Sequence, residues 1–139
     1  MSQLYSTSFK PESYIQQFFP TLDNEPEIQW HLDEAHKIFS GRGILGEGAG
    51  QGVARSLLEV GTGPTPFNTG SAGGWASAVL WADYLPVNRR FARAWLQQEG
   101  ATPAFATFFD HVAGREGAGT GDHVADRLRE KVAGWFLST

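Results

Sequence analysis

The stretch Leu57-Leu58-Glu59-Val60-Gly61-Thr62-Gly63-Pro64-Thr65 determines the fold class that this sequence predicts. It opens with a short apolar run that contains one acid, which predicts a buried parallel strand over 57–60. Gly61 and Gly63 follow directly, and this glycine spacing predicts a tight turn against which a nucleotide can lie. A Cβ at either position would hold the ligand off the backbone, and a positive φ there would cost another residue roughly 1 kcal/mol or more.

A second strand is predicted over 78–82, and Asp83 comes directly after it, 20 residues beyond Gly63. Dinucleotide-binding α/β folds carry at this distance the carboxylate that binds the ribose hydroxyls. The third glycine of the dinucleotide pattern is missing, because Pro64-Thr65-Pro66 follows Gly63, and pyrophosphate binding is therefore disfavoured. Glu59 would repel a phosphate but suits a cationic or amino-bearing ligand such as S-adenosylmethionine.

The string 58–65, followed by Ala82-Asp83-Tyr84 and then Asn88, resembles the nicotinamide, phenylethanolamine and thioether methyltransferase family. The resemblance runs along essentially the whole chain and covers the N-terminal half of a family member. It implies an α/β fold with a Rossmann-like, doubly wound parallel sheet of the methyltransferase type, incomplete and preceded by an N-terminal helical lid. The expected units are the lid with a Gly-rich connector over 1–56 and the cofactor-binding half of a methyltransferase domain over 57–139.

The same resemblance implies S-adenosylmethionine as the cofactor and a small amine or related small molecule as the methyl acceptor. The cofactor-binding residues that it implies are Tyr5, Tyr14, Gly61, Gly63, Thr65, Asp83, Tyr84 and Asn88. A further tyrosine of the family falls on Phe19, which lacks the hydroxyl, and the Asp-Trp-Ser-Pro signature is replaced by Ala-Phe-Ala-Thr at 104–107. No catalytic side chain is named, because methyl transfer from a sulfonium needs alignment and a desolvated pocket more than an acid or base.

Two other classes of function stay open on the sequence. A non-catalytic half-domain or truncated fragment that binds cofactor or a partner chain is favoured by the early stop at Thr139. A dinucleotide-dependent oxidoreductase is less favoured, because it needs the missing third glycine and a partner domain with a hydride site.

The composition of the chain excludes several classes of protein. The chain has 139 residues, 41% of them hydrophobic, which is enough for the core of one domain. Its net charge of −4 provides no field for nucleic acid or an anionic membrane, and no cysteine is present. The polar first residues and the lack of an 18-residue apolar run make a soluble cytoplasmic protein the expectation. His31 and His36 are five residues apart, which does not place two ligands on one helix face, so no metal site is predicted.

Apolar periodicity predicts helices that begin at Pro11, near Pro26, at Pro86 and after Pro103. Gly41 to Gly52 is read as a flexible connector, and the glycines at 70, 73 and 74 predict a weak or short helix there. A last helix is expected with Asp122 as N-cap and an apolar stripe of Val124, Leu128, Val132 and Trp135. The cluster of Arg89, Arg90 and Arg93 is interpreted as a solvated helix face.

The third strand of the sheet is expected to begin at or just beyond Thr139, which would leave its slot beside the first strand empty. Leu58 and Val60 would then be half-exposed at an unpaired edge. Such an edge invites pairing with another chain, so marginal folding or self-association through the uncovered sheet edge is predicted.

Overall fold

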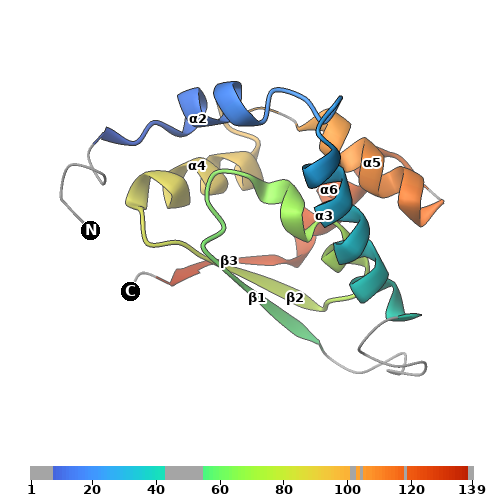
Figure 1. Cartoon of the computed structure of the whole chain (residues 1–139). Coiled ribbons are helices and arrows are strands. Elements are labelled where there is room, and N and C mark those ends of the chain that lie inside the picture. Colours follow the sequence, from blue (N-terminus) through green and yellow to red (C-terminus); the bar gives the residue numbers. More distant parts are fainter. Residues whose placement is uncertain (1–7, 43–54, 101–102, 104, 118, 138–139) are drawn as a thin grey trace.

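The computed structural model describes residues 8–42, 55–100, 103, 105–117 and 119–137, with the backbone alone described at 41–42 and 133–137 (Figure 1). Tyr5 and residues 43–52 of the expected connector lie outside the described residues. Within the described residues a parallel sheet contains β1 (Ser56–Val60), β2 (Ala78–Ala82) and β3 (Val132–Leu137), in the order β1-β2-β3. The predictions of strands over 57–60 and 78–82 are confirmed.

The strand β3 corrects two expectations about the end of the chain. Val132 and Trp135 were expected on a helix, but the last helix ends at Lys131 and Val132 is already extended. The run 132–137 contains Val, Trp and Phe together with Gly134, and this composition favours a strand over a helix. The third strand therefore lies inside the chain and pairs with β2, not in the slot beside β1.

The helices of the described residues cover one face of the sheet. Figure 1 shows the helices gathered above the sheet. Val79 and Trp81 of β2 are fully buried beneath them, whereas Leu58 and Val60 of β1 are 52% and 78% exposed. Alternate residues of a strand point to opposite faces, so Leu58 and Val60 lie on the uncovered face. Within the described part of the chain, no strand pairs with the outer edge of β1.

The α-helices within the described residues include α2 (Pro11–Phe18), α3 (Pro26–Lys37), α4 (Pro86–Gln97), α5 (Ala106–Glu116) and α6 (Gly121–Lys131). A π-helical turn, Ile38–Arg42, extends α3, and the 3₁₀ helices Pro66–Thr69 and Ser71–Gly74 follow the first strand. These short turns confirm the weak helix that the glycines predict. Proline occupies the first turn of α2, α3 and α4, where its missing N–H costs no intrahelical hydrogen bond.

The start of α6 differs by two residues from the prediction. Asp122 was expected as the N-cap, but Thr120 occupies that position, and its Oγ1 accepts a 3.2 Å hydrogen bond from the amide of His123. Asp122 lies inside the first turn, where its negative charge complements the helix dipole. Both residue types are favourable at a helix N-cap. Thr120 takes that position because its backbone is extended, as an N-cap residue requires.

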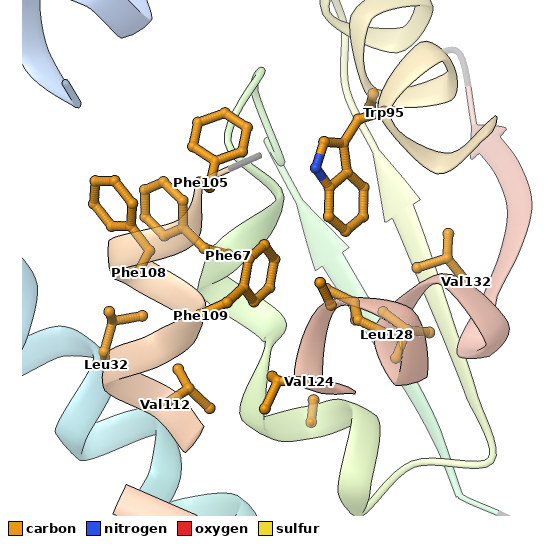
Figure 2. Close-up of a cluster of buried hydrophobic side chains, with 14 of the residues drawn as sticks. Leu32, Phe67, Trp95, Phe105, Phe108, Phe109, Val112, Val124, Leu128 and Val132 are labelled. Carbon is orange, nitrogen blue, oxygen red and sulfur yellow. The ribbon is translucent and has the colours of Figure 1, made fainter. Parts of the chain in front are cut away.

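The hydrophobic core lies between the sheet and the helices (Figure 2). Phe67 stacks on Phe108 with ring centroids 4.1 Å apart, and Trp95 stacks on Phe109 at 5.6 Å. Leu32 of α3 joins the same cluster. Residues before and after position 56 therefore share a core, and the proposed division of the chain at that position stays a prediction.

An ion-pair cluster holds α3 against α5. Asp33 accepts hydrogen bonds from Nε2 of His111 at 2.7 Å and from Nε and Nη2 of Arg115 at 2.7 and 2.8 Å. Burial raises the pKa of the Asp33 carboxyl, but these hydrogen bonds and the charges of the two partners outweigh it and hold the pKa below its usual value. The cluster fixes α3, which forms one wall of the cavity described below.

No group of three or more His, Asp or Glu side chains within the described ranges is arranged to hold a metal ion. None of the described helices combines the length and the apolar character that a membrane crossing requires.

Candidate functional site

The turn after β1 adopts the conformation that its glycines permit. Gly61 and Gly63 have φ of +72° and +65°, and no heavy atom of the described residues lies within 4 Å of a Cβ built on either. The amides of Gly61 and Thr62 donate to the carbonyl of Ala82 at 2.7 and 3.2 Å, which ties the turn to the end of β2. The turn therefore combines a fixed backbone with open space beside it.

Asp83 links this turn to the next helix. Its Oδ2 accepts from the amide of Gly63 at 2.7 Å, and its Oδ1 accepts from the amide of Leu85 at 2.8 Å and from Nδ2 of Asn88 at 3.2 Å. Asp83 is 8% exposed and Asn88 is 5% exposed. Three donors hold the carboxylate in one orientation at the carboxyl ends of both strands.

Asn88 keeps an unused acceptor at the same place. Its Oδ1 is buried and has no hydrogen-bond partner within the described residues. A buried acceptor without a partner costs about 1–3 kcal/mol, so a ligand that donates a hydrogen bond there would recover that energy. Thr65 is also buried, whereas Tyr84, directly after Asp83, is 54% exposed.

Arg89 is a site residue that the sequence analysis did not identify. It was expected on a solvated face, but its Nη1 donates to the carbonyls of both Asp83 and Tyr84 at 2.8 Å. The signal was present in its position, because a long cationic side chain in the first turn of a helix reaches back toward the preceding strand end. The sequence analysis instead grouped Arg89 with Arg90 and Arg93 as one basic cluster on a solvated face.

The helix α2 and its flanking residues bring aromatic rings to the 3₁₀ helix that follows the glycine turn. Tyr14 packs against Phe9, Phe18 and Phe19, with ring centroids 5.4, 5.1 and 5.5 Å away. Phe19 in turn packs on Phe67 at 5.7 Å, in the 3₁₀ helix that follows the glycine turn. The predicted lid is thus connected to the turn through Phe19, at the position where the family carries a tyrosine.

A cavity of about 680 Å³ lies between α2, α3 and the end of β1. Its wall is mostly aromatic, aliphatic and acidic, and the residues that line it are Phe18, Phe19, Glu25, Glu27, Ile28, His31, Leu32, Glu59, Phe67 and Asn68. Such a mixture of rings and carboxylates suits an organic cation more than an anion.

One acid in the wall of this cavity, Glu59, has a strongly shifted pKa. Burial raises the pKa of its carboxyl to about 7, and hydrogen bonds with Thr69 and Asn68 offset part of that rise. Thr69 also accepts from Nε1 of Trp81 at 3.2 Å, so its own hydroxyl hydrogen is available to Glu59. Oε2 of Glu59 is buried and lacks a partner within the described residues.

The structure brings Gly61, Gly63, Asp83 and Asn88 into one cluster at the carboxyl ends of β1 and β2. A glycine turn and an acid at the ends of adjacent parallel strands are typical of α/β proteins that bind a nucleoside there. Of the other predicted residues, Tyr14 lies on α2, and Tyr5 lies outside the described residues.

Comparison with known proteins shows which family of α/β proteins this chain resembles. The model of the NNMT/PNMT/TEMT family matches residues 1–136. Bovine phenylethanolamine N-methyltransferase is 33% identical over 70 residues, which cover 50% of this chain and 25% of the relative. Mouse indolethylamine N-methyltransferase is 24% identical over 118 residues, which cover 81% of this chain and 41% of the relative. The pig phenylethanolamine enzyme is 31% identical over 84 residues, 60% of this chain and 30% of the relative.

The chain belongs to the NNMT/PNMT/TEMT family of methyltransferases. It spans between a quarter and about two fifths of the length of these curated relatives. Its mixture of helices and parallel strands is consistent with part of a methyltransferase α/β fold.

Proposed function

We propose that this chain binds S-adenosylmethionine and takes part in the N-methylation of a small amine. The observation that carries the proposal is the 2.7 Å hydrogen bond between Gly63 and Asp83, which assembles an open glycine turn and a fixed carboxylate in a member of this family. In this proposal the described strands form part of a doubly wound, Rossmann-like sheet.

The residues present fit this cofactor in shape and chemistry. The open space beside Gly61 and Gly63 leaves room for a ligand to approach the backbone. Oδ2 of Asp83 accepts one hydrogen bond and retains capacity for a ribose hydroxyl, and Oδ1 of Asn88 is unused. A cationic methionine end beside Glu59 would favour the ionised carboxylate, whose pKa burial raises to about 7 in the chain without ligand.

The bound cofactor would supply a methyl group on a sulfonium, transferred by in-line displacement to the acceptor nitrogen. The contribution of this chain is alignment and the exclusion of water, through the turn, Asp83 and the aromatic rings of α2. The cavity beside Glu59 suits an amine that carries an aromatic ring, because it offers both aromatic walls and carboxylates. The names of the bovine and mouse relatives refer to phenylethanolamine and indolethylamine, which are amines of this kind.

A second candidate is a cofactor-binding unit without methyltransferase activity of its own. It requires the cofactor site alone, which is the part of the proposal that the cluster around Asp83 supports. The two candidates share the cofactor site and differ in whether an acceptor is methylated.

Calorimetric titration combined with a radiolabelled methyl-transfer assay tests both. The proposal expects saturable binding of S-adenosylhomocysteine, the demethylated product, and methyl transfer to phenylethanolamine or tryptamine. Binding without transfer would support the second candidate. Tighter binding of NAD than of S-adenosylhomocysteine would overturn both.

A further inference from the structure

Arg89 is attached to the backbone that carries Asp83. It is the fourth residue of α4, its side chain is half-buried, and its Nη1 donates to the carbonyls of Asp83 and Tyr84 at 2.8 Å each. The two hydrogens of this single nitrogen therefore hold two consecutive peptide units of the β2–α4 connection.

The second of these peptide units is held at both ends. Its carbonyl, from Tyr84, accepts from Arg89, while its amide, from Leu85, donates to Oδ1 of Asp83 at 2.8 Å. Because a peptide unit is planar, fixing its oxygen also fixes the direction of its N–H. Arg89 thus determines where one donor of the Asp83 carboxylate points.

The other contacts of Asp83 complete this arrangement. Asn88 donates to Oδ1 from α4, and Gly63 donates to Oδ2 from the glycine turn. Without Arg89 these hydrogen bonds of the carboxylate would be the remaining ties of the connection, and the carboxylate could rotate with the loop. A misplacement of about 1 Å is enough to weaken recognition strongly.

We propose that Arg89 is a positioning residue for nucleoside recognition, which orients the carboxylate of Asp83 toward the 2′ and 3′ hydroxyls of the bound ribose. This inference rests on the proposed function, because it assumes that Asp83 binds a ribose. It assigns a role to a residue that contacts the backbone and not the ligand.

The test compares ligands that differ in the two hydroxyls alone. S-adenosylhomocysteine and its 2′,3′-dideoxy analogue are titrated into the full chain and into Arg89→Ala, Arg89→Lys and Arg90→Ala. Arg90 is a matched control on the same helix, since its side chain is exposed. The readout is the ratio of the two affinities, which a general loss of stability does not change selectively.

We expect the unsubstituted chain and Arg90→Ala to prefer the ligand with hydroxyls by the same factor. Arg89→Ala should reduce that preference about tenfold, and Arg89→Lys, which keeps a cation with several donors, should retain more of it than alanine does. Amide hydrogen exchange at Leu85 and Gly63 should accelerate in Arg89→Ala without ligand, because their acceptor is no longer fixed.

Two results would overturn the inference. An unchanged preference in Arg89→Lys and in folded Arg89→Ala would show that Asp83 needs no such support. Equal affinity of the unsubstituted chain for both ligands would show that Asp83 does not read the ribose, although cofactor binding itself would stand. A lack of binding by the unsubstituted chain to either ligand would instead remove the proposed function and this inference with it.

Discussion

The amide of Gly63 donates a 2.7 Å hydrogen bond to Oδ2 of Asp83, which joins the turn after β1 to the end of β2. The turn and the carboxylate that a nucleoside would contact are therefore one unit and not two adjacent features. A change at either residue should affect the other.

Replacing Asp83 by asparagine tests this unit. The carboxylate accepts from three donors, whereas an amide has one acceptor oxygen and directs an NH₂ group at one of those donors. We expect binding of S-adenosylhomocysteine to weaken by about 1.5–3 kcal/mol, as titration calorimetry would measure. Asp126→Asn is the control, because its side chain is 64% exposed and forms an ion pair with Arg129, three residues further along α6. Equal affinities for the two variants would contradict the assignment.

The buried carboxyl of Glu59 predicts a pH dependence of stability. Its pKa is raised from 4.5 to about 7, so between these values the folded chain holds a proton that the unfolded chain has lost. The stabilisation is complete below pH 4.5 and is lost as the pH rises through 7, with a slope of at most about 1.4 kcal/mol per pH unit. Urea denaturation between pH 5 and pH 8 should show this slope, and Glu59→Gln should remove it. The exposed Glu130→Gln should leave it unchanged, and a slope that persists in Glu59→Gln would assign it to another group.

The contact between α5 and α6 depends on Gly121. A Cβ there would lie 2.8 Å from the backbone nitrogen of Asp110, and a backbone atom cannot move aside as a side chain does. We expect Gly121→Ala to lower the free energy of unfolding by about 1–3 kcal/mol. Gly114→Ala is the matched control inside α5, where no described heavy atom lies within 4 Å and alanine should add about 0.5–1 kcal/mol. Equal stability of the two variants would show that the helices separate at no cost.

The exposed side chains of β1 and its outer edge, which pairs with no strand among the described residues, predict self-association. Parallel strands are normally buried on both faces, yet Val60 is 78% exposed and Leu58 is 52% exposed. We propose that two copies pair through this strand, and sedimentation velocity should show concentration-dependent association. Val60→Lys should abolish it, whereas Trp30→Ala, which removes a 58% exposed ring from α3, should not. A monomer at every concentration would contradict the proposal.

Local sequence patterns were enough to predict the strand and turn at the centre of the site. The strands over 57–60 and 78–82, the glycine turn and the nearby acid at Asp83 depend on neighbouring residues and on one loop of 20 residues. The role of Arg89 depends on the direction of one long side chain, which the sequence does not encode locally. The raised pKa of Glu59 depends on its burial in the folded chain, which outweighs the lowering effect of Thr69 and Asn68, and no pattern around Glu59 contains that information.

The error over 132–137 has a different cause. Val132 and Trp135 continue the helical spacing of Val124 and Leu128, so periodicity alone extends the helix. These residues form a strand instead, because the edge of β2 pairs with them and places Val132 opposite Val79. Hydrogen bonding to a neighbouring strand is a tertiary effect that overrides a periodic pattern at its end.

The short separation of the site residues along the chain has a consequence for folding. Ser56 of β1 pairs with Ala78 of β2, and Gly63 meets Asp83 across 20 residues, so the loops to be closed are short. Closing a short loop costs little chain entropy, and contacts of this kind tend to form early. Because domains fold from the N-terminal side during synthesis, the turn and the carboxylate can assemble while later parts of the chain are still on the ribosome.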